Sequence, residues 1–210
     1  MQPGTWSQDI IELNLSFLRL LRDAMAEDMA LAAQEFGFPG REDKLSMLGA
    51  LSEDKLLNLA SADLLFGIPQ DDEDEFDIEL DKAVRGGPVE PYISLLVDDR
   101  GRALRPWQQE RRMFDLMAWM VIRQCVQSDP LVAKAVFRLK DPMVISRIRR
   151  LTPKGAHRLA NWGGNSKLRV SQALILHLTM AFNDIEGNLL LIPAGAMQTS
   201  CRHVDSHVMV

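Results

Sequence analysis

The sequence is poor in cysteine, and Cys125 and Cys201 are the two that it has. Two cysteines are too few for the disulfide framework that supports small secreted domains. The first residues also lack the basic segment and apolar core of a signal peptide. The longest apolar stretch, residues 174–182, contains His177 and is too short to span a bilayer. We therefore expect a cytoplasmic protein that makes no contact with membranes.

Aromatic residues are also scarce, at 6% of the chain, although 47% of its 210 residues are hydrophobic. Aliphatic residues and methionine therefore supply most of the apolar side chains. Such a composition suits packed helices better than a β-sandwich, whose strands favour aromatic and β-branched residues. At this length the chain can bury a core as one large domain or as two small ones.

Signatures of catalytic and metal sites are few. Residues 163–167 are rich in glycine, but they lack the spacing and the preceding strand of a phosphate-binding loop. Cys201, His203 and His207 offer three metal ligands where a structural zinc site needs four. We predict that the protein is not an enzyme and that it holds no metal or cofactor.

One helix–turn–helix pattern occurs twice in the chain, about a hundred residues apart. Apolar residues recur at matching positions, and a small hydroxyl residue stands where it can cap the next helix. A gap of a single residue keeps the two copies in register. The first copy contains Asp28, Ala32, Phe36, Leu45, Leu48, Leu51, Ser52, Leu56, Leu59 and Ala60, and the second contains Asp129, Ala133, Phe137, Ile145, Ile148, Leu151, Thr152, Ala156, Leu159 and Ala160. Repeated helical units bury their apolar faces on each other.

The helix boundaries follow from spacing and capping residues. Residues 8–36 carry apolar residues three or four positions apart, which predicts one long amphipathic helix. Ser52 is placed to cap a later helix of the first copy. In the second copy, Pro130, Pro142 and Pro153 each follow a capping residue. This arrangement predicts three helix starts, because proline is favoured in the first turn of a helix.

The segment between the two copies is acidic. Residues 71–81 are dense in Asp and Glu, and glycines and prolines follow them. Repulsion between like charges favours an extended linker here. Residues 92–97 can form a strand that turns at residues 99–101, which predicts a small β-hairpin in the linker.

We therefore predict a mainly α protein with four regions. Residues 1–70 form one helical module, 71–105 the acidic linker, 106–195 a second and more basic module, and 196–210 a flexible tail. Each module consists of a long helix followed by two short helices. The two modules are expected to pack on each other as an intramolecular pseudo-dimer.

The net charge of −5 conceals a strong polarity along the chain. Residues 1–100 contain 8 Lys and Arg against 22 Asp and Glu, whereas residues 101–210 contain 16 against 7. Such an asymmetry suggests an anionic partner for the basic half. Several of the basic residues recur at three- and four-residue steps across the second helix–turn–helix. The predicted DNA-binding residues are Arg147, Arg149, Arg150, Lys154, Arg158, Lys167 and Arg169.

The first copy cannot form the same basic surface. It has Met47, Ala50, Asp54 and Asn58 where the second copy has Arg147, Arg150, Lys154 and Arg158. Lysine and arginine on one face can neutralise DNA phosphates, which supply most non-specific affinity. Two alternatives remain open, namely a merely solvated face and arginines that pair with the protein's own acidic linker.

The first copy also resembles a known family. The residues that carry the resemblance are Asp9, Ile10, Leu13, Asn14, Leu15, Ser16, Phe17, Leu18, Asp28, Phe36, Gly37, Leu48, Gly49, Ala50, Leu51, Ser52, Leu56, Leu59 and Ala60. They are similar to the FlhD family, whose members are subunits of the bacterial flagellar master transcriptional activator. The resemblance covers roughly residues 8–66, and the second copy resembles the same module more faintly.

The resemblance implies a helical module that works with partners. These are a zinc-containing FlhC-like protein, promoter DNA and RNA polymerase. For the interface with a partner or a second module we expect the residues Leu13, Phe17, Leu20, Leu48 and Leu51. The sequence thus favours a transcriptional activator subunit that binds promoter DNA with an FlhC-like partner. The alternative is an adaptor or anti-activator that sequesters this partner and does not bind DNA.

Overall fold

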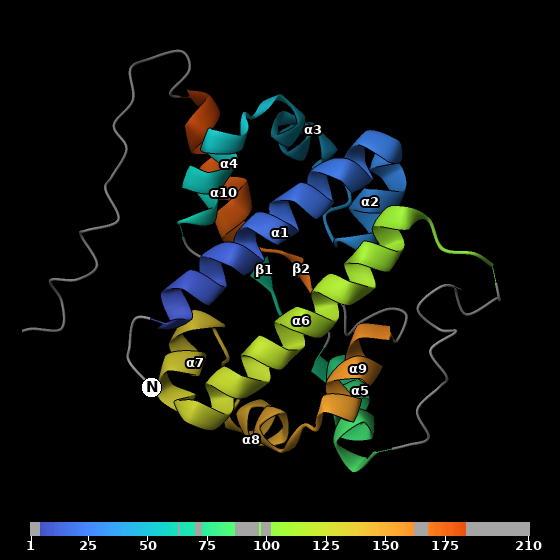
Figure 1. Cartoon of the computed structure of the whole chain (residues 1–210), viewed down its shortest axis with the longest axis vertical. Helices are drawn as coiled ribbons and strands as arrows, with labels where there is room; N and C mark the ends of the chain where they lie inside the picture. The colour runs from blue at the N-terminus through green and yellow to red at the C-terminus, as the bar shows by residue number, and fades with distance from the viewer. Residues whose placement is uncertain are drawn as a thin grey trace, which may run out of the picture.

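Helices dominate the structure, a computed structural model that describes residues 5–62, 64–69, 73–86, 97, 102–161 and 168–183. Short helices follow a long one in each half of the chain, which confirms the mainly α prediction (Figure 1). In the first half the elements are α1 (Thr5–Glu27), α2 (Met29–Glu35), α3 (Glu42–Ser46), the 3-10 helix η1 (Met47–Ala50) and α4 (Glu53–Ala60). In the second half they are α6 (Pro106–Ser128), α7 (Pro130–Val136), α8 (Pro142–Arg150) and α9 (Pro153–Asn161).

The single long helix predicted over residues 8–36 is in fact two helices, α1 and α2, which meet at Asp28. Asp28 leaves the helical conformation, with φ −155° and ψ 92°, and its carboxylate accepts a hydrogen bond of 3.0 Å from the Leu31 amide. This bond, together with the Arg105 side chain, holds the pKa of Asp28 below its ordinary value. The capping carboxylate therefore starts a new helix where the apolar spacing alone predicts a continuous one.

The two halves have a similar order of elements, and two pairs of their helices, α2 with α7 and α4 with α9, have matching side-chain caps. Helices α1 and α6 are both 23 residues long, and α2 and α7 are both 7 residues long. Asp129 caps α7 with φ −147° and ψ 94°, much as Asp28 caps α2. Ser52 and Thr152 each accept a hydrogen bond from the amide three residues further on. The origin of this likeness in a tandem duplication stays a prediction.

The acidic segment after the first half is a helix rather than the extended linker that the sequence predicted. It forms α5 (Glu73–Arg85), which packs on α8 and α9. Phe76, Leu80 and Ala83 are buried, and the Phe76 ring stacks on Trp119 with 6.1 Å between ring centroids. Burial of this apolar face outweighs the charge repulsion on the opposite face.

The predicted hairpin in the linker lies mostly outside the described residues. One part of it is visible, because Val97 pairs with Ala103 in an isolated antiparallel bridge. The predicted turn at residues 99–101 lies between these two residues. The predicted tail, residues 196–210, also falls outside the described part of the chain.

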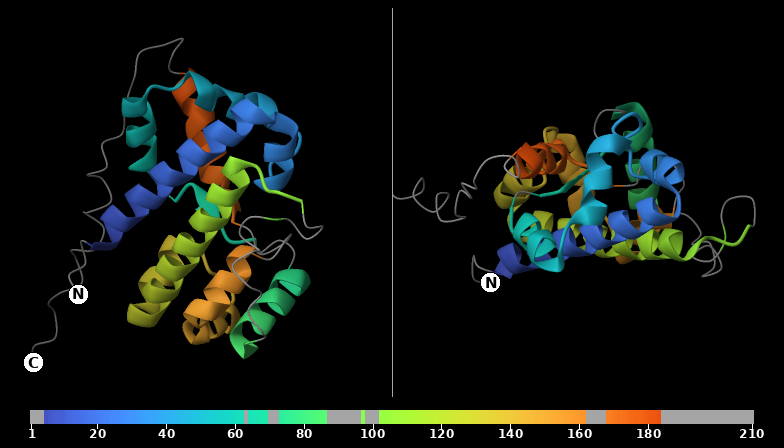
Figure 2. Two further views of the ribbon diagram at one scale, coloured as in Figure 1. Left: turned by 45° about the vertical axis from the view of Figure 1, so that its right-hand side comes forward. Right: turned by 90° about the horizontal axis from the view of Figure 1, so that it is seen from above.

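A small antiparallel sheet joins the ends of the two halves. Strand β1 (Phe66–Gly67) pairs with β2 (Arg169–Val170), with Phe66 opposite Val170. Each strand leads to a helix that covers the other half. Helix α5 follows β1 and packs on α8 and α9, whereas α10 (Gln172–Asn183) follows β2 and packs on α3. Figure 2 shows α5 beside α9, at the opposite end of the molecule from α10.

The core lies where α1 and α6 pack against each other in opposite directions (Figure 1). At its centre is Phe17, whose ring centroid lies 5.7 Å from that of Phe36, 5.6 Å from Phe66 and 5.3 Å from Phe114. Phe114 belongs to α6, and the other three residues belong to the first half. One continuous hydrophobic cluster therefore includes side chains from both halves of the chain.

A buried asparagine ties α1 to the end of α4. The Asn14 amide donates to the Ala60 carbonyl at 2.9 Å, and its oxygen accepts from the Leu65 amide at 3.0 Å. We expect Asn14→Leu to lower the free energy of unfolding by about 2–4 kcal/mol, because both backbone groups lose this partner inside the core. Urea denaturation measures the change. The exposed Asn58→Leu is the control, and an equally small effect of both changes would contradict this role.

Candidate nucleic-acid interface

The predicted basic surface is built on α8 and α9. Asp141 caps α8 by accepting from the Met143 amide at 2.7 Å, and Thr152 caps α9 by accepting from the Gly155 amide at 3.0 Å. Val144 and Ile148 of α8 turn into the core, as do Ala156 and Leu159 of α9. Three of the basic residues between these positions, Arg149, Arg150 and Lys154, are therefore exposed.

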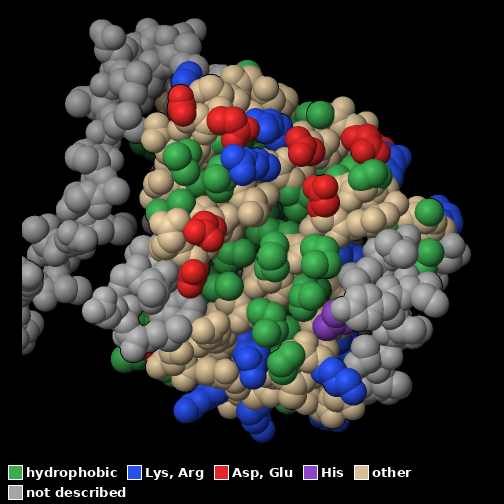
Figure 3. Space-filling view, viewed as in Figure 1, with side chains coloured by type: hydrophobic (Ala, Val, Ile, Leu, Met, Phe, Trp, Pro, Cys, Tyr) green, Lys and Arg blue, Asp and Glu red, His purple; other side chains and the backbone are tan. Residues whose placement is uncertain are grey.

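The structure separates the seven predicted DNA-binding residues into several groups. Arg149, Arg150 and Lys154 are exposed on α8 and α9. Arg158 of α9 is half-buried, and Lys167 lies outside the described residues. Figure 3 shows lysine and arginine side chains gathered at the end of the molecule where α8 lies. The same view shows acidic side chains mainly over the first half, around α1 to α4.

The sequence predicted that Arg147 binds DNA, but in the structure this arginine is paired with two carboxylates of the chain itself. Its Nη1 lies 2.6 Å from the Asp77 carboxylate, and its Nε lies 3.7 Å from the Asp81 carboxylate, both on α5. The hydrogen bond to Asp77 raises the pKa of the arginine above its ordinary value. Of the interpretations left open by the sequence, pairing with the protein's own acidic segment is therefore correct for Arg147.

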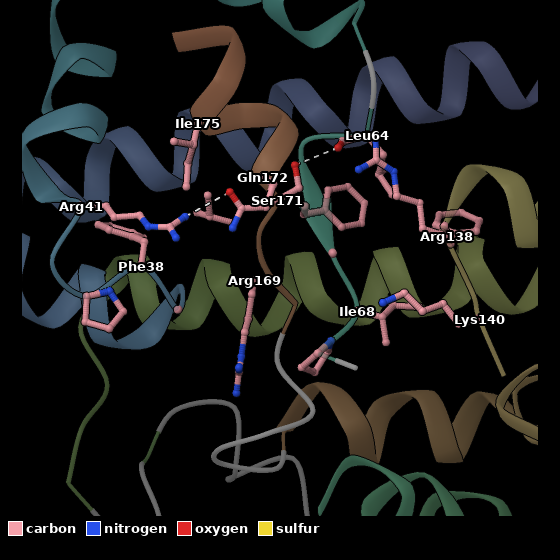
Figure 4. A pocket seen from close by; sticks show the side chains of 17 residues that line it. Phe38, Arg41, Leu64, Ile68, Arg138, Lys140, Arg169, Ser171, Gln172 and Ile175 are labelled. Atoms are coloured by element: carbon pink, nitrogen blue, oxygen red, sulfur yellow. Dashed lines mark hydrogen bonds between the residues drawn. The ribbon is translucent and has the colours of Figure 1, made fainter. Parts of the chain in front are cut away.

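Arg169 lies elsewhere, on β2 beside the first half of the chain. It lines a cavity together with three basic residues that sequence reasoning missed, Arg41, Arg138 and Lys140 (Figure 4). A comparison of the two copies of the sequence contains a signal for one of these three residues, Arg138. Arg138 follows Phe137, at the position where glycine follows Phe36 in the first copy, and it has a positive φ of 52°.

The predicted interface residues lie inside the chain. Leu13, Phe17, Leu20 and Leu48 are buried, and Leu51 is half-buried against the same core. Phe17 touches α6 through Phe114, so it lies at the contact between the two halves of one chain. These side chains face the protein's own interior.

An exposed apolar face remains along α6. Met113 and Met117, one helical turn apart, are 47% and 48% exposed. Figure 3 shows hydrophobic side chains along the face that α1 and α6 share. Methionine side chains adapt to different surfaces, and exposed apolar patches are typical of protein contacts.

The described residues offer no metal site and no membrane segment. They contain no group of three or more His, Cys, Asp or Glu that could hold a metal ion. Cys201, His203 and His207 lie outside them. Within the same part of the chain, no helix is both long enough and apolar enough to cross a membrane.

Comparison with known proteins identifies the first half. The family model for FlhD, the flagellar transcriptional activator, matches residues 1–83, which include α1 to α4, β1 and most of α5. No curated protein matches the chain, and no solved structure does. The family matched by this helical segment is a family of transcription regulators. Residues 1–83 are therefore similar to the FlhD family of flagellar transcriptional activators, which confirms the resemblance seen in the sequence.

Proposed function

We propose that the protein is a transcriptional activator subunit that binds promoter DNA together with a zinc-containing FlhC-like partner. The match of residues 1–83 to the FlhD family carries this proposal. The proposed role includes recruitment of RNA polymerase, a cytoplasmic location and no catalytic activity.

We further propose that the two halves are tandem copies that pair within one chain. The equal lengths of α1 and α6 and of α2 and α7, the aspartate caps of α2 and α7 and the reciprocal packing of α5 and α10 support this arrangement. In such a pseudo-dimer the buried contact between α1 and α6 replaces a contact between two subunits. The exposed face with Met113 and Met117 is then the surface that we propose for the FlhC-like partner.

For DNA contact we propose the exposed basic residues Arg149, Arg150 and Lys154. Cations on this surface can bind phosphates, which position a protein on DNA without reading its sequence. The FlhC-like partner is therefore expected to supply part of the promoter specificity. This division of roles is consistent with the acidic character of the first half.

We expect the triple change Arg149→Ala, Arg150→Ala and Lys154→Ala to weaken promoter binding by the complex. If all three residues contact phosphates, the slope of log affinity against log salt decreases by about 3. Fluorescence anisotropy with promoter DNA, at several salt concentrations and with the partner present, measures this effect. The matched control changes Lys44, Lys55 and Lys82 to Ala, which removes the same charge from other surfaces.

The alternative function is an adaptor or anti-activator that sequesters the FlhC-like partner. The ion pairs of Arg147 with Asp77 and Asp81 favour it, because an acidic helix covers part of the basic surface. Under this alternative the chain and its partner co-purify, while the triple change leaves DNA affinity as it was. A failure of the partner to co-purify, with no shift of promoter DNA, would exclude both functions.

A further inference from the structure

A cavity of about 430 Å³ lies where the two halves of the chain meet. One side comes from the turn after α2, and the opposite side comes from the turn between α7 and α8. The paired strands β1 and β2 and the start of α10 complete it. Its volume falls in the range of pockets that hold small ligands. Figure 4 shows the side chains around it.

Four cationic side chains surround this cavity. Arg41 lies on one side, Arg138 and Lys140 lie on the other, and Arg169 extends from β2 between them (Figure 4). No aspartate or glutamate is present among the described residues that line it. A concentration of positive charge in a hollow of this kind attracts anions.

Two of these side chains have neighbours that fix their position. Arg41 donates a hydrogen bond of 3.2 Å from its Nη1 to the Gln172 side chain. The stem of Arg169 packs over Gly37, where a Cβ atom would lie 2.7 Å from the Arg169 Cδ. The absence of a side chain at Gly37 therefore makes room for this arginine at the edge of the cavity.

Arg138 is held in an unfavourable backbone conformation. Its φ of 52° lies in the left-handed region, and among the described residues it is the one non-glycine residue with a positive φ. The first copy has Gly37, with φ 70°, at the corresponding position. Strained residues of this kind concentrate at functional sites. The chain thus carries an arginine at a cavity wall where glycine would be easier to accommodate.

We propose that this cavity binds a ligand that carries phosphate groups. Guanidinium groups match phosphate oxygens in pairs of parallel hydrogen bonds, and lysine adds a compact positive charge. Because the four cations stand on different sides, a ligand with several linked phosphates satisfies more of them than a single phosphate ion does. Phe38, Ile68 and Ile175 also line the cavity, where they form a largely buried apolar wall.

The phosphate groups can belong to a small nucleotide or to the backbone of a nucleic acid strand. The site differs from the surface proposed for promoter contact, because Arg149, Arg150 and Lys154 do not line it. The proposal therefore stands or falls independently of the proposed function.

Isothermal titration calorimetry of the full chain tests the site, with pyrophosphate, ATP and a single-stranded oligonucleotide as separate probes. Adenosine, which lacks phosphate, serves as the negative probe. We expect at least one phosphate probe to bind and adenosine to give no heat. Arg138→Gly and Arg169→Gln are each expected to weaken that binding about tenfold or more, because charged hydrogen bonds are lost.

The controls separate a binding role from a structural one. Glycine accepts the backbone conformation of residue 138, so Arg138→Gly is expected to keep the thermal midpoint while it loses affinity. Lys55→Gln removes the same charge outside the cavity, at an exposed position on α4, and is expected to leave the affinity unchanged. Binding of the oligonucleotide alone would assign the phosphates to nucleic acid, and binding of ATP or pyrophosphate would assign them to a small ligand. No binding of any phosphate probe, or equal binding by Arg138→Gly and the unchanged protein, would overturn the proposal.

Discussion

Asp115→Ala is expected to lower the free energy of unfolding by about 3–5 kcal/mol, because it removes the partner of a buried arginine. The Arg111 and Asp115 side chains are 2% and 0% exposed, and the Arg111 Nε lies 3.0 Å from the carboxylate. The Arg111 guanidinium also donates to the Leu168 carbonyl and lies 4.0 Å above the centre of the Phe36 ring. The arginine therefore contacts both halves of the chain, since Leu168 belongs to the second half and Phe36 to the first. Without Asp115 the charge of Arg111 is left buried and uncompensated.

A double-mutant cycle in urea distinguishes this loss from a simple cavity effect. The double change Arg111→Met and Asp115→Leu removes both charges and is expected to recover much of the stability. The exposed pair of Arg19 and Glu53 is the control, since the loss of a surface ion pair costs at most about 1 kcal/mol. If Asp115→Ala and the double change were equally unstable, loss of packing rather than the unpaired charge would be the cause.

Phe17→Ala is expected to cost about 3–5 kcal/mol, as large-to-small changes of buried aromatic residues do. Its ring is fully buried and touches three other aromatic rings from α6 and from the first half. Because the two halves share this cluster, we expect the variant to unfold in one transition, as the unchanged protein does. Urea curves followed by circular dichroism and by tryptophan fluorescence should coincide.

Leu57→Ala is the control for this variant, because Leu57 is 48% exposed and its truncation removes little buried surface. Its expected cost is below about 0.5 kcal/mol. Two separate transitions, with only the first shifted by Phe17→Ala, would show that the halves unfold independently. That result would contradict the shared core.

The sequence predicted most helix boundaries in the second half because its capping residues are unambiguous. Asp129, Asp141 and Thr152 each precede a proline, and the helices α7, α8 and α9 begin at these prolines. The break at Asp28 was missed because no proline follows it, and only its side-chain hydrogen bond reveals the cap. Helix α5 was missed because charge dominates residues 71–81 and obscures the apolar residues Phe76 and Leu80.

The site was less predictable than the fold because it depends on contacts between distant segments. Periodicity placed Arg147, Arg149 and Arg150 on one short helix, but it could not show that α5 supplies a carboxylate to the first of them. The cavity around Arg138 and Arg169 is formed by turns and strands far apart in the sequence. No local pattern brings such segments together, although the replacement of a glycine by Arg138 between the two copies was visible.

The reciprocal packing of α5 and α10 affects how the protein responds to dilution. Each of these helices follows one half of the chain and covers the other half. In an assembly of two separate subunits, such an exchange would make stability depend on subunit concentration. Here both halves belong to one polypeptide, so their contact is intramolecular and persists at any concentration. A protein built in this way keeps the contact between its two halves even when a cell contains only a few copies of it.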